Sequence, residues 1–368
     1  KIKILWVGGW WNKSLNRMIT EWLNGVDFVA INTDAQDLAA NHAEKKINIW
    51  LNITKWLWAW TDPEVWRKAA EESSDEIKEM LQKTDMVFVT CWMWWGTWSW
   101  AAPVVAEIAK EMWILTVGIV TKPFSFEWKK RDSNADEWLK RMKEAVDTLI
   151  IIPNEKIFTI ADKKTTFRQA FTMIDKILYL GVWWITDLLI NPWDINIDFA
   201  DIKVVMKNSW NALLWIGYGK WEKRAVDAAR QAIENPLLET NLDGAKSVIF
   251  AVTGWEDITP IEVQEAASVV EDILDENVNL VWWMTLDPSY EDEVKVTIIA
   301  TWFEKQSEEP VLKDVNRDIL WRKKSWQSWW DNFISREINS ESNNWSNDTN
   351  NKSSDNDDET PAFMRKSL

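Results

Sequence analysis

The sequence is short of glycine and of the residues that support disulfide or metal chemistry. Its 368 residues include 10 glycines, 1 cysteine and 1 histidine. The single cysteine, Cys91, allows no internal disulfide, which is consistent with a reducing compartment such as the cytoplasm. The sole histidine, His42, lies in a polar stretch without partners for metal or triad chemistry. We therefore expect His42 to be an ordinary surface residue.

The chain also lacks a long apolar run and an excess of basic residues. No segment is apolar for long enough to span a bilayer, and no signal peptide is visible. The formal net charge is −16, whereas broad nucleic-acid binding needs a basic surface. These absences predict a cytoplasmic protein with no direct membrane insertion and no nucleic-acid partner.

Tryptophan stands in excess where glycine is scarce. The chain has 32 tryptophans, although glycine is normally among the commonest residues. The segment Thr90–Pro103 reads TCWMWWGTWSWAAP, between a strand pattern and a helical pattern. A loop that wraps backbone N–H groups around phosphate at such a place needs glycine. This loop holds Gly96 and five tryptophans, which are Trp92, Trp94, Trp95, Trp98 and Trp100.

With those five residues taken as glycine, the loop reads G-M-G-G-G-T-G-S-G and resembles the phosphate loop of the tubulin/FtsZ family. The resemblance runs from Lys1 to about Phe303 and includes the last few residues. Of the 27 tryptophans in 1–303, about 25 stand where FtsZ proteins carry glycine. Trp183 and Trp282 do not align clearly with family glycines.

Two explanations of the tryptophans follow. If they are real, a left-handed backbone at about half of those sites costs roughly 1–2 kcal/mol each, a sum comparable to a domain's stability of about 5–15 kcal/mol. The other explanation is that the codon UGA encodes glycine, as in some bacterial lineages, but was translated as tryptophan. We interpret the tryptophans in this second way, which implies a bacterial FtsZ. Real tryptophans would instead imply a catalytically inactive filament scaffold.

The first glycine-rich turn does not identify the nucleotide by itself. It follows the strand pattern of Lys1–Leu5 and reads WVGGWWN over residues 6–12, and a GxGxxG-like turn also suits an NAD enzyme. Asn32 and Asp34 follow the next strand, where an NAD enzyme places its ribose-binding acid. The tubulin-like loop favours the GTPase over this Rossmann-type alternative.

The resemblance implies a set of residues that bind GTP or GDP. Thr121–Arg131 is similar to the family pattern TKPFxFEGKKR, and the helical pattern of about Thr166–Ile190 resembles the helix that crosses behind the guanine. Local alternatives remain: strand-end caps for Asn32 and Asp34, a surface ion pair for Arg131 and core packing for Phe171. The implied residues are Gly8, Gly9, Trp10, Trp11, Asn12, Lys13, Asn32, Asp34, Trp94, Trp95, Gly96, Thr97, Trp98, Glu127, Arg131, Phe171 and Asp175.

The segment 191–201 matches the family's N-x-D-F-A-D loop at Asn196, Asp198 and Asp201. The two carboxylates are three residues apart, so at a helix start they can point the same way. Two acids and an amide suit the positioning of a water for attack on a phosphate. An N-cap is the structural alternative for Asp198. The resemblance implies that this loop acts on the nucleotide of the next subunit, and that Mg²⁺ accompanies the phosphates although no metal-ligand cluster is visible.

The expected fold class is α/β, with a Rossmann-like GTPase domain (1–165), a long central helix (166–190) and a second α/β domain (191–303). A helix is expected over about Pro63–Gln82. Residues 304–359 are rich in Ser, Asn and Asp and should form a disordered linker. The terminal peptide 360–368 resembles the family segment that binds membrane-tethering and regulatory division proteins. The resemblance thus implies a head-to-tail homopolymer at the mid-cell division site.

Overall fold

The computed structural model describes most of the residues between Lys1 and Trp302. The described ranges are 1–8, 15–16, 18–19, 25–49, 63–92, 101–124, 129–160, 165–190, 199–234, 242, 244–275, 277–287, 290 and 292–302. All of them belong to one compact unit, Lys1–Glu309. The expected linker and terminal peptide lie outside the described residues.

The described strands form one ten-stranded sheet in the order β3-β2-β1-β4-β5-β6-β7-β10-β8-β9. Pairing is parallel from β3 to β7 and between β8 and β9, and β10 is antiparallel to both of its neighbours. The strands are β1 (Ile2–Val7), β2 (Val26–Asn32), β3 (Lys45–Asn48), β4 (Met86–Trp92), β5 (Leu115–Lys122), β6 (Thr148–Pro153), β7 (Ser209–Lys220), β8 (Ser247–Gly254), β9 (Asn279–Leu286) and β10 (Glu293–Trp302).

The helices alternate with these strands. They are α2 (Ala35–Ala40), α3 (Pro63–Glu72), α4 (Ser74–Leu81), α5 (Ala101–Glu111), α6 (Lys129–Ala145), α7 (Ile157–Ile160), α8 (Phe167–Ile190), α9 (Phe199–Met206), α10 (Arg224–Ile233) and α11 (Pro260–Glu271), with short 3-10 turns η3 (Asn154–Lys156) and η4 (Trp221–Lys223). The single helix expected over 63–82 is instead two helices. They part at Ser73, whose ψ of 11° leaves the helical range.

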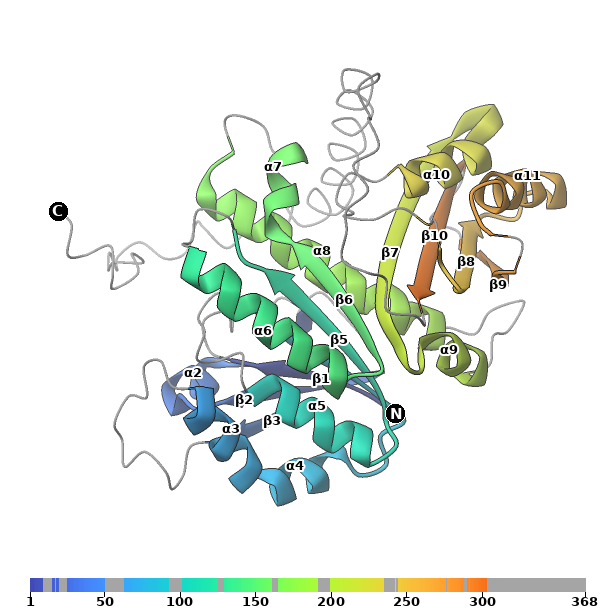
Figure 1. Cartoon of the computed structure of the whole chain (residues 1–368). Helices are drawn as coiled ribbons and strands as arrows, with labels where there is room; N and C mark the ends of the chain where they lie inside the picture. The colour runs from blue at the N-terminus through green and yellow to red at the C-terminus, as the bar shows by residue number, and fades with distance from the viewer. Residues whose placement is uncertain are drawn as a thin grey trace, which may run out of the picture. The chain divides into compact units, whose positions relative to one another are not determined.

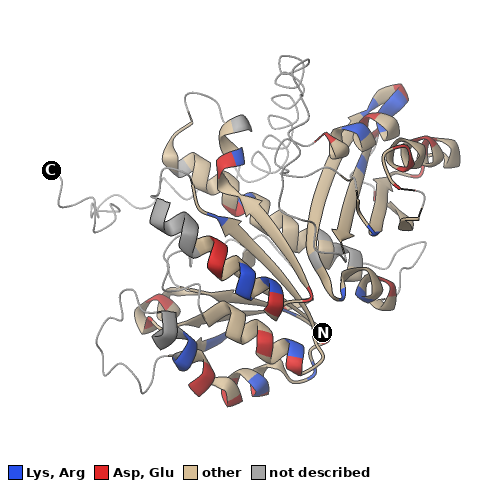
Figure 2. Ribbon diagram, viewed as in Figure 1, with Lys and Arg blue, Asp and Glu red and all other residues tan. Residues whose placement is uncertain are grey.

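Two hydrophobic cores hold the sheet and its helices together. One core lies between strands β1, β2, β4, β5 and helices α3 to α6. The other lies between β7, β8, β10 and helices α10 and α11. The strands read as continuous apolar runs because both faces of a parallel sheet are covered, and charged residues accordingly mark mainly the helices (Figure 2). No helix in the described ranges is both long and apolar enough to cross a membrane.

The central helix α8 joins the two halves of the sheet (Figure 1). It packs on β5 and β6, and at Gly181 a Cβ would lie 3.7 Å from the side chain of Ile119. The helix has 24 residues and is therefore about 36 Å long. It also contacts α7, which with η3 follows the carboxyl end of β6.

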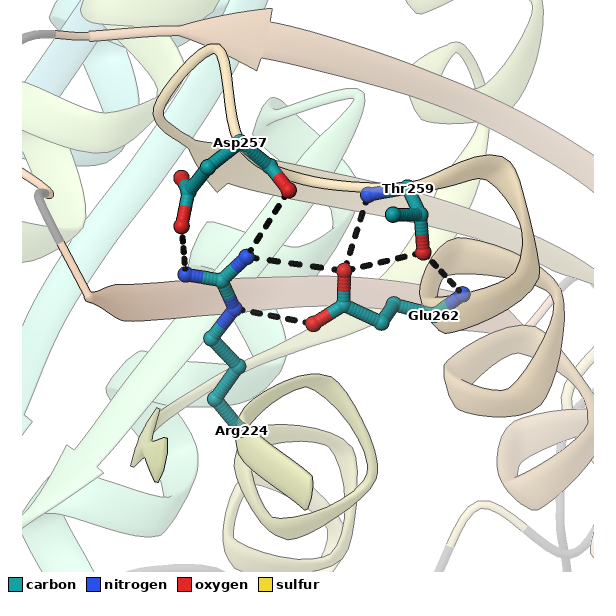
Figure 3. Close-up of polar contacts among 4 residues, drawn as sticks. All are labelled: Arg224, Asp257, Thr259 and Glu262. Carbon is teal, nitrogen blue, oxygen red and sulfur yellow. Dashed lines mark hydrogen bonds and ion pairs between the residues drawn. The ribbon is translucent and has the colours of Figure 1, made fainter. Parts of the chain in front are cut away.

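In the second core, α10 lies unusually close to β7. A Cβ built at Gly217 or Gly219 would overlap backbone carbonyl oxygens of α10, so only glycine permits this approach. The N-terminal end of α10 is fixed by Arg224, whose guanidinium reaches Asp257 Oδ2 at 2.6 Å and Glu262 Oε1 at 2.9 Å (Figure 3). Glu262 also closes a capping box with Thr259 at the start of α11, which links this helix to the same ion pairs.

Candidate functional site

The carboxyl ends of five parallel strands, β2, β1, β4, β5 and β6, lie side by side at one edge of the sheet. Ligands of open α/β sheets bind at this edge, where the loops diverge. Gly8 follows β1 with a φ of 118°, a conformation that few L residues adopt. Its N–H donates to the Ile31 carbonyl at 2.9 Å, so the chain turns immediately at the edge.

Four polar side-chain atoms near this edge are buried without a hydrogen-bond partner among the described residues. They are Asn32 Nδ2, Thr90 Oγ1, Thr121 Oγ1 and Asn154 Oδ1. Such atoms cost about 1–3 kcal/mol each when unsatisfied, and most are paired in native proteins. These atoms can therefore serve a bound ligand or the chain segments outside the described ranges, although the Asn32 amide also acts on the neighbouring Asp37 carboxylate.

Asn154 was missed by the sequence reasoning. It immediately follows β6, begins η3 and is buried. An amide in this position offers both donors and an acceptor to a polar ring. The available signal was a polar residue at the carboxyl end of a buried strand of a parallel sheet, where Asn32 likewise ends β2.

Asn32 and Asp34 organise the turn after β2. Asn32 Oδ1 accepts from the Asp34 N–H at 3.2 Å. Asp34 caps α2, because its Oδ1 accepts from the N–H groups of Gln36 at 2.8 Å and Asp37 at 3.4 Å. Burial, followed by the charge of Asp34, raises the pKa of Asp37 against the opposing effect of the Asn32 amide. Asp34 is therefore the N-cap of α2 rather than a strand-end cap, and its direct role at the nucleotide stays a prediction.

Phe171 and Asp175 lie four residues apart in the first half of α8, so they share one face of the helix. Phe171 is half-buried and meets Phe124 edge-on, with ring centroids 5.8 Å apart. Phe124 in turn lies 5.2 Å from Phe158 of α7. Asp175 is buried one turn further along α8. An aromatic face beside a buried carboxylate suits a flat base with N–H groups on its edge.

Asp201 lies far from this edge. It is exposed in the first turn of α9, the helix that follows the distal end of α8. The C-terminal end of α9 adjoins the start of β6, since Thr148 Oγ1 donates to the Met206 carbonyl. Thr148 begins β6 whereas Asn154 follows its end. Asp201 therefore belongs to the amino edge of the sheet, opposite Gly8 and Asn154.

The remaining sequence-predicted residues are not placed. Arg131 falls within α6, but its side chain is outside what the structure describes. Wholly outside the described residues lie Gly9, Trp10, Trp11, Asn12, Lys13, Trp94, Trp95, Gly96, Thr97, Trp98, Glu127, Asn196 and Asp198. Their roles stay predictions.

Comparison with known families adds to this geometry. Residues 1–162 match the model of the tubulin/FtsZ family GTPase domain, and residues 211–304 match the C-terminal domain of the FtsZ family. The two matches together span more than half of the chain. They correspond to the two halves of the sheet on either side of α8.

Solved structures agree with the family models. An FtsZ dimer from M. jannaschii is 39% identical with a TM-score of 0.76, over 86% of this chain and 94% of that one. A tryptophan-to-tyrosine mutant of M. jannaschii FtsZ is 41% identical with a TM-score of 0.74, over 82% and 90%. CetZ2 of Haloferax volcanii, a GTPγS-bound protofilament, shares the fold with a TM-score of 0.67 at 15% identity, over 90% and 99%. By these matches the chain belongs to the FtsZ family of tubulin-like GTPases.

Proposed function

We propose that this protein binds and hydrolyses GTP and assembles head to tail, with each hydrolysis site completed by two successive subunits. The proposal rests on one observation, the separation between the residues proposed to bind the nucleotide and the proposed catalytic residue Asp201. The buried polar atoms and Phe171 gather at the carboxyl edge, whereas Asp201 begins α9 at the amino edge. From Phe171 to its end at Ile190, α8 extends for about 28 Å, so Asp201 of one molecule cannot act on that molecule's own nucleotide.

The division of labour follows from this geometry. At the carboxyl edge, Asp175 and Asn154 are proposed to bind the guanine edge, with Phe171 against the ring. The turn at Gly8 and the loop before α5 supply backbone N–H groups to the phosphates. Asn196, Asp198 and Asp201 of the adjoining subunit orient a water toward the terminal phosphate, where catalysis is mostly positioning.

We propose that Mg²⁺ binds together with the nucleotide. Within the described ranges, no group of three or more His, Cys, Asp or Glu side chains is arranged to hold a metal. Mg²⁺ commonly keeps several waters and binds through substrate phosphates. The ion would supply charge neutralisation at the phosphates, and no described side chain is assigned to it.

A heterologous, head-to-tail interface that does not close on itself generates a filament. Two of the similar structures are an FtsZ dimer and a CetZ2 protofilament, which supports self-association here. We extend the proposal to a bacterial division ring at mid-cell, with residues 1–165, 166–190 and 191–303 as GTPase domain, central helix and C-terminal domain. Residues 304–359 would be a linker and 360–368 the peptide that binds membrane-tethering and regulatory partners.

We also propose that most of the written tryptophans are glycines in the cell. Trp113 has a φ of 63° and is 80% exposed. It closes α5 with the bonds Trp113 N–H to Lys110 O and Ile114 N–H to Ala109 O, the Schellman pattern in which this position is usually glycine. Trp221 has a φ of 76° and is 82% exposed. In addition, Trp302 buries an indole N–H that has no partner among the described residues.

The intact mass of protein from its native cells tests the decoding. A mass below 43.3 kDa by some thirty Trp-to-Gly exchanges supports glycine-rich phosphate loops. A mass equal to that of the written chain favours the inactive scaffold, because indoles would then fill the loops.

The GTPase proposal is tested by turnover per molecule across a protein dilution series. We expect near-zero turnover in the dilute monomer and a steep rise above a critical concentration, because the site is completed only by assembly. A turnover per molecule that is flat in concentration contradicts the split site. Turnover that is absent at every concentration contradicts the GTPase itself.

A further inference from the structure

Lys295 is a buried lysine in the middle of β10. The residue is only 4% exposed, and its Nζ lies 5.2 Å from the ring centroids of both Trp183 and Tyr290. Both distances fall within the range of about 6 Å over which an aromatic face attracts a cation. Tyr290 comes shortly before β10, whereas Trp183 lies more than a hundred residues away on α8.

The register of β10 explains why this ammonium faces the central helix. Val294, Val296 and Ile298 belong to the core beneath α10 and α11. Side chains alternate along a strand, so Lys295 points to the opposite face of the sheet. On that face its Nζ meets the indole of Trp183 from α8.

A buried ammonium is costly unless its charge is compensated. At Lys295 the compensation includes the faces of two aromatic rings, and desolvation strengthens such contacts. A glycine at position 183 would remove one of the two rings. Trp183 therefore differs from Trp113 and Trp221, which are exposed at left-handed backbone positions. Trp113 does lie under a lysine, with Lys207 Nζ 5.6 Å from its ring centroid, but Lys207 is exposed and water can solvate its charge without the ring.

We propose that Trp183 is a genuine tryptophan and that Trp183, Lys295 and Tyr290 form an aromatic box that fastens the C-terminal sheet to α8. Trp183 lies eight residues beyond Asp175 on the same helix, about 12 Å along its axis. Beyond Trp183, α8 leads into the segment 191–198 and α9. The box thus acts as a positioning device for the proposed catalytic loop, and this catalytic consequence rests on the function proposed above.

The first test is the identity of residue 183 in the native protein. Trypsin releases the peptide between Lys176 and Lys203, which carries Trp183, Trp184 and Trp193 in the written sequence. Fragment masses are expected to show tryptophan at 183 and glycine at 184 and 193. Glycine at 183 overturns the box, even if it supports the decoding at the other two positions.

The second test is a double-mutant cycle on unfolding, in a recoded gene that carries the residues found in the native protein. The variants are Lys295→Met, Trp183→Leu and the double change, with Trp282→Leu, at an exposed position of β9, as the matched control. We expect Trp183→Leu to lower the folding equilibrium constant by about tenfold or more. Adding Lys295→Met should then recover part of that loss, because it removes a charge that has lost a ring.

The coupling free energy between Trp183 and Lys295, obtained from this cycle, decides the test. Trp183→Phe keeps a ring and should preserve most of the coupling, whereas Trp282→Leu should show none. Purely additive effects of Trp183→Leu and Lys295→Met overturn the box.

The effect of the box on catalysis is tested separately from the GTPase activity itself. Lys295→Met is expected to leave nucleotide affinity of the dilute protein unchanged and to lower maximal turnover in the assembled state. Unchanged turnover in this variant contradicts the positioning role, while the GTPase proposal stands. Failure of the wild-type chain to turn over GTP contradicts the proposed function instead, and the unfolding cycle still decides the box.

Discussion

The Arg224 cluster permits a graded prediction of stability. Its guanidinium is nearly enclosed, with the side chain 8% exposed, whereas the carboxylates of Asp257 and Glu262 are 44% and 22% exposed. Losing one partner of a buried ion pair costs about 3–5 kcal/mol, but exposed carboxylates are partly stabilised by water. The three side chains therefore contribute unequally, although they meet in one cluster (Figure 3).

Of the two carboxylate substitutions, Glu262→Ala is expected to lower the free energy of unfolding more than Asp257→Ala. It removes the bond from Arg224 Nε at 2.9 Å and also the half of the capping box that the Glu262 side chain makes, its bonds from the Thr259 N–H and Oγ1. A charged hydrogen bond contributes about 1.5–3 kcal/mol and a helix cap about 1 kcal/mol. We predict a loss of about 3 kcal/mol for Glu262→Ala and about 1–2 kcal/mol for Asp257→Ala, after discounting for exposure.

The assay is denaturant unfolding of the full chain, with Glu265→Ala as the control. Glu265 is exposed on the same helix, so its removal should change the free energy of unfolding by no more than about 0.5 kcal/mol. A Glu262→Ala loss as small as that of the control would refute the assignment of the cluster as the clamp between α10 and α11.

The same cluster has a pH signature. Burial raises the pKa of Glu262, but hydrogen bonds from Arg224 and Thr259 outweigh burial, so the net pKa is lowered. A lowered folded-state pKa adds stability above the unfolded value of about 4.3, and this stability is lost as the pH falls through the folded-state pKa. The stability difference between wild type and Glu262→Gln should therefore shrink in acid below about pH 4.3.

Three further predictions follow from buried positions. Gly219→Ala should lower the free energy of unfolding by about 3 kcal/mol because its Cβ would overlap the Arg224 carbonyl. Gly181→Ala, with its nearest contact at 3.7 Å, should be neutral or stabilise by up to about 1 kcal/mol. Thermal unfolding of both variants distinguishes the close approach of α10 from a general effect of replacing glycine by alanine. Cys91 is buried and burial raises its thiol pKa, so alkylation should require unfolding, and rapid labelling of the native protein would contradict the buried position. Asn154→Ala should weaken GDP binding by about tenfold or more, measured by titration calorimetry, and unchanged affinity would remove Asn154 from the site.

Much of the first half of the fold could be predicted because its signals are local. The apolar runs that became β1, β4 and β5 are bounded by turn residues and need both faces covered, which the sequence alone indicates. The spacing of apolar residues likewise predicted α8. The break at Ser73 escaped prediction because Glu and Lys favour helix on both sides of it.

β7 was not predicted, for a physical reason. It contains Gly217 and Gly219, which weaken an isolated strand. The strand conformation of this segment depends on antiparallel pairing with β10 and on the close approach of α10. These contacts join residues far apart in the chain. The box around Lys295 was hidden in the same way, because nothing local associates a lysine with an indole over a hundred residues earlier.

The candidate site was predictable to the extent that motifs named its residues. Phe171 and Asp175 were named from the resemblance of this helix to the family's central helix, and the structure shows them on one face of α8; their roles at the nucleotide stay predictions. Asn154 was passed over because a lone Asn after a strand carries no motif, and its significance came only from a buried oxygen without a partner among the described residues.

Mixing two inactive variants tests the central claim of a site shared by successive subunits most directly. Asp201→Asn keeps the nucleotide pocket, and Asp175→Asn keeps the catalytic loop, so each alone should turn over GTP poorly. After co-sedimentation verifies mixed filaments, an equal mixture should recover about a quarter of wild-type turnover, because random head-to-tail contacts join an intact pocket to an intact loop once in four. Mixed filaments that remain as inactive as either variant alone would contradict the shared site.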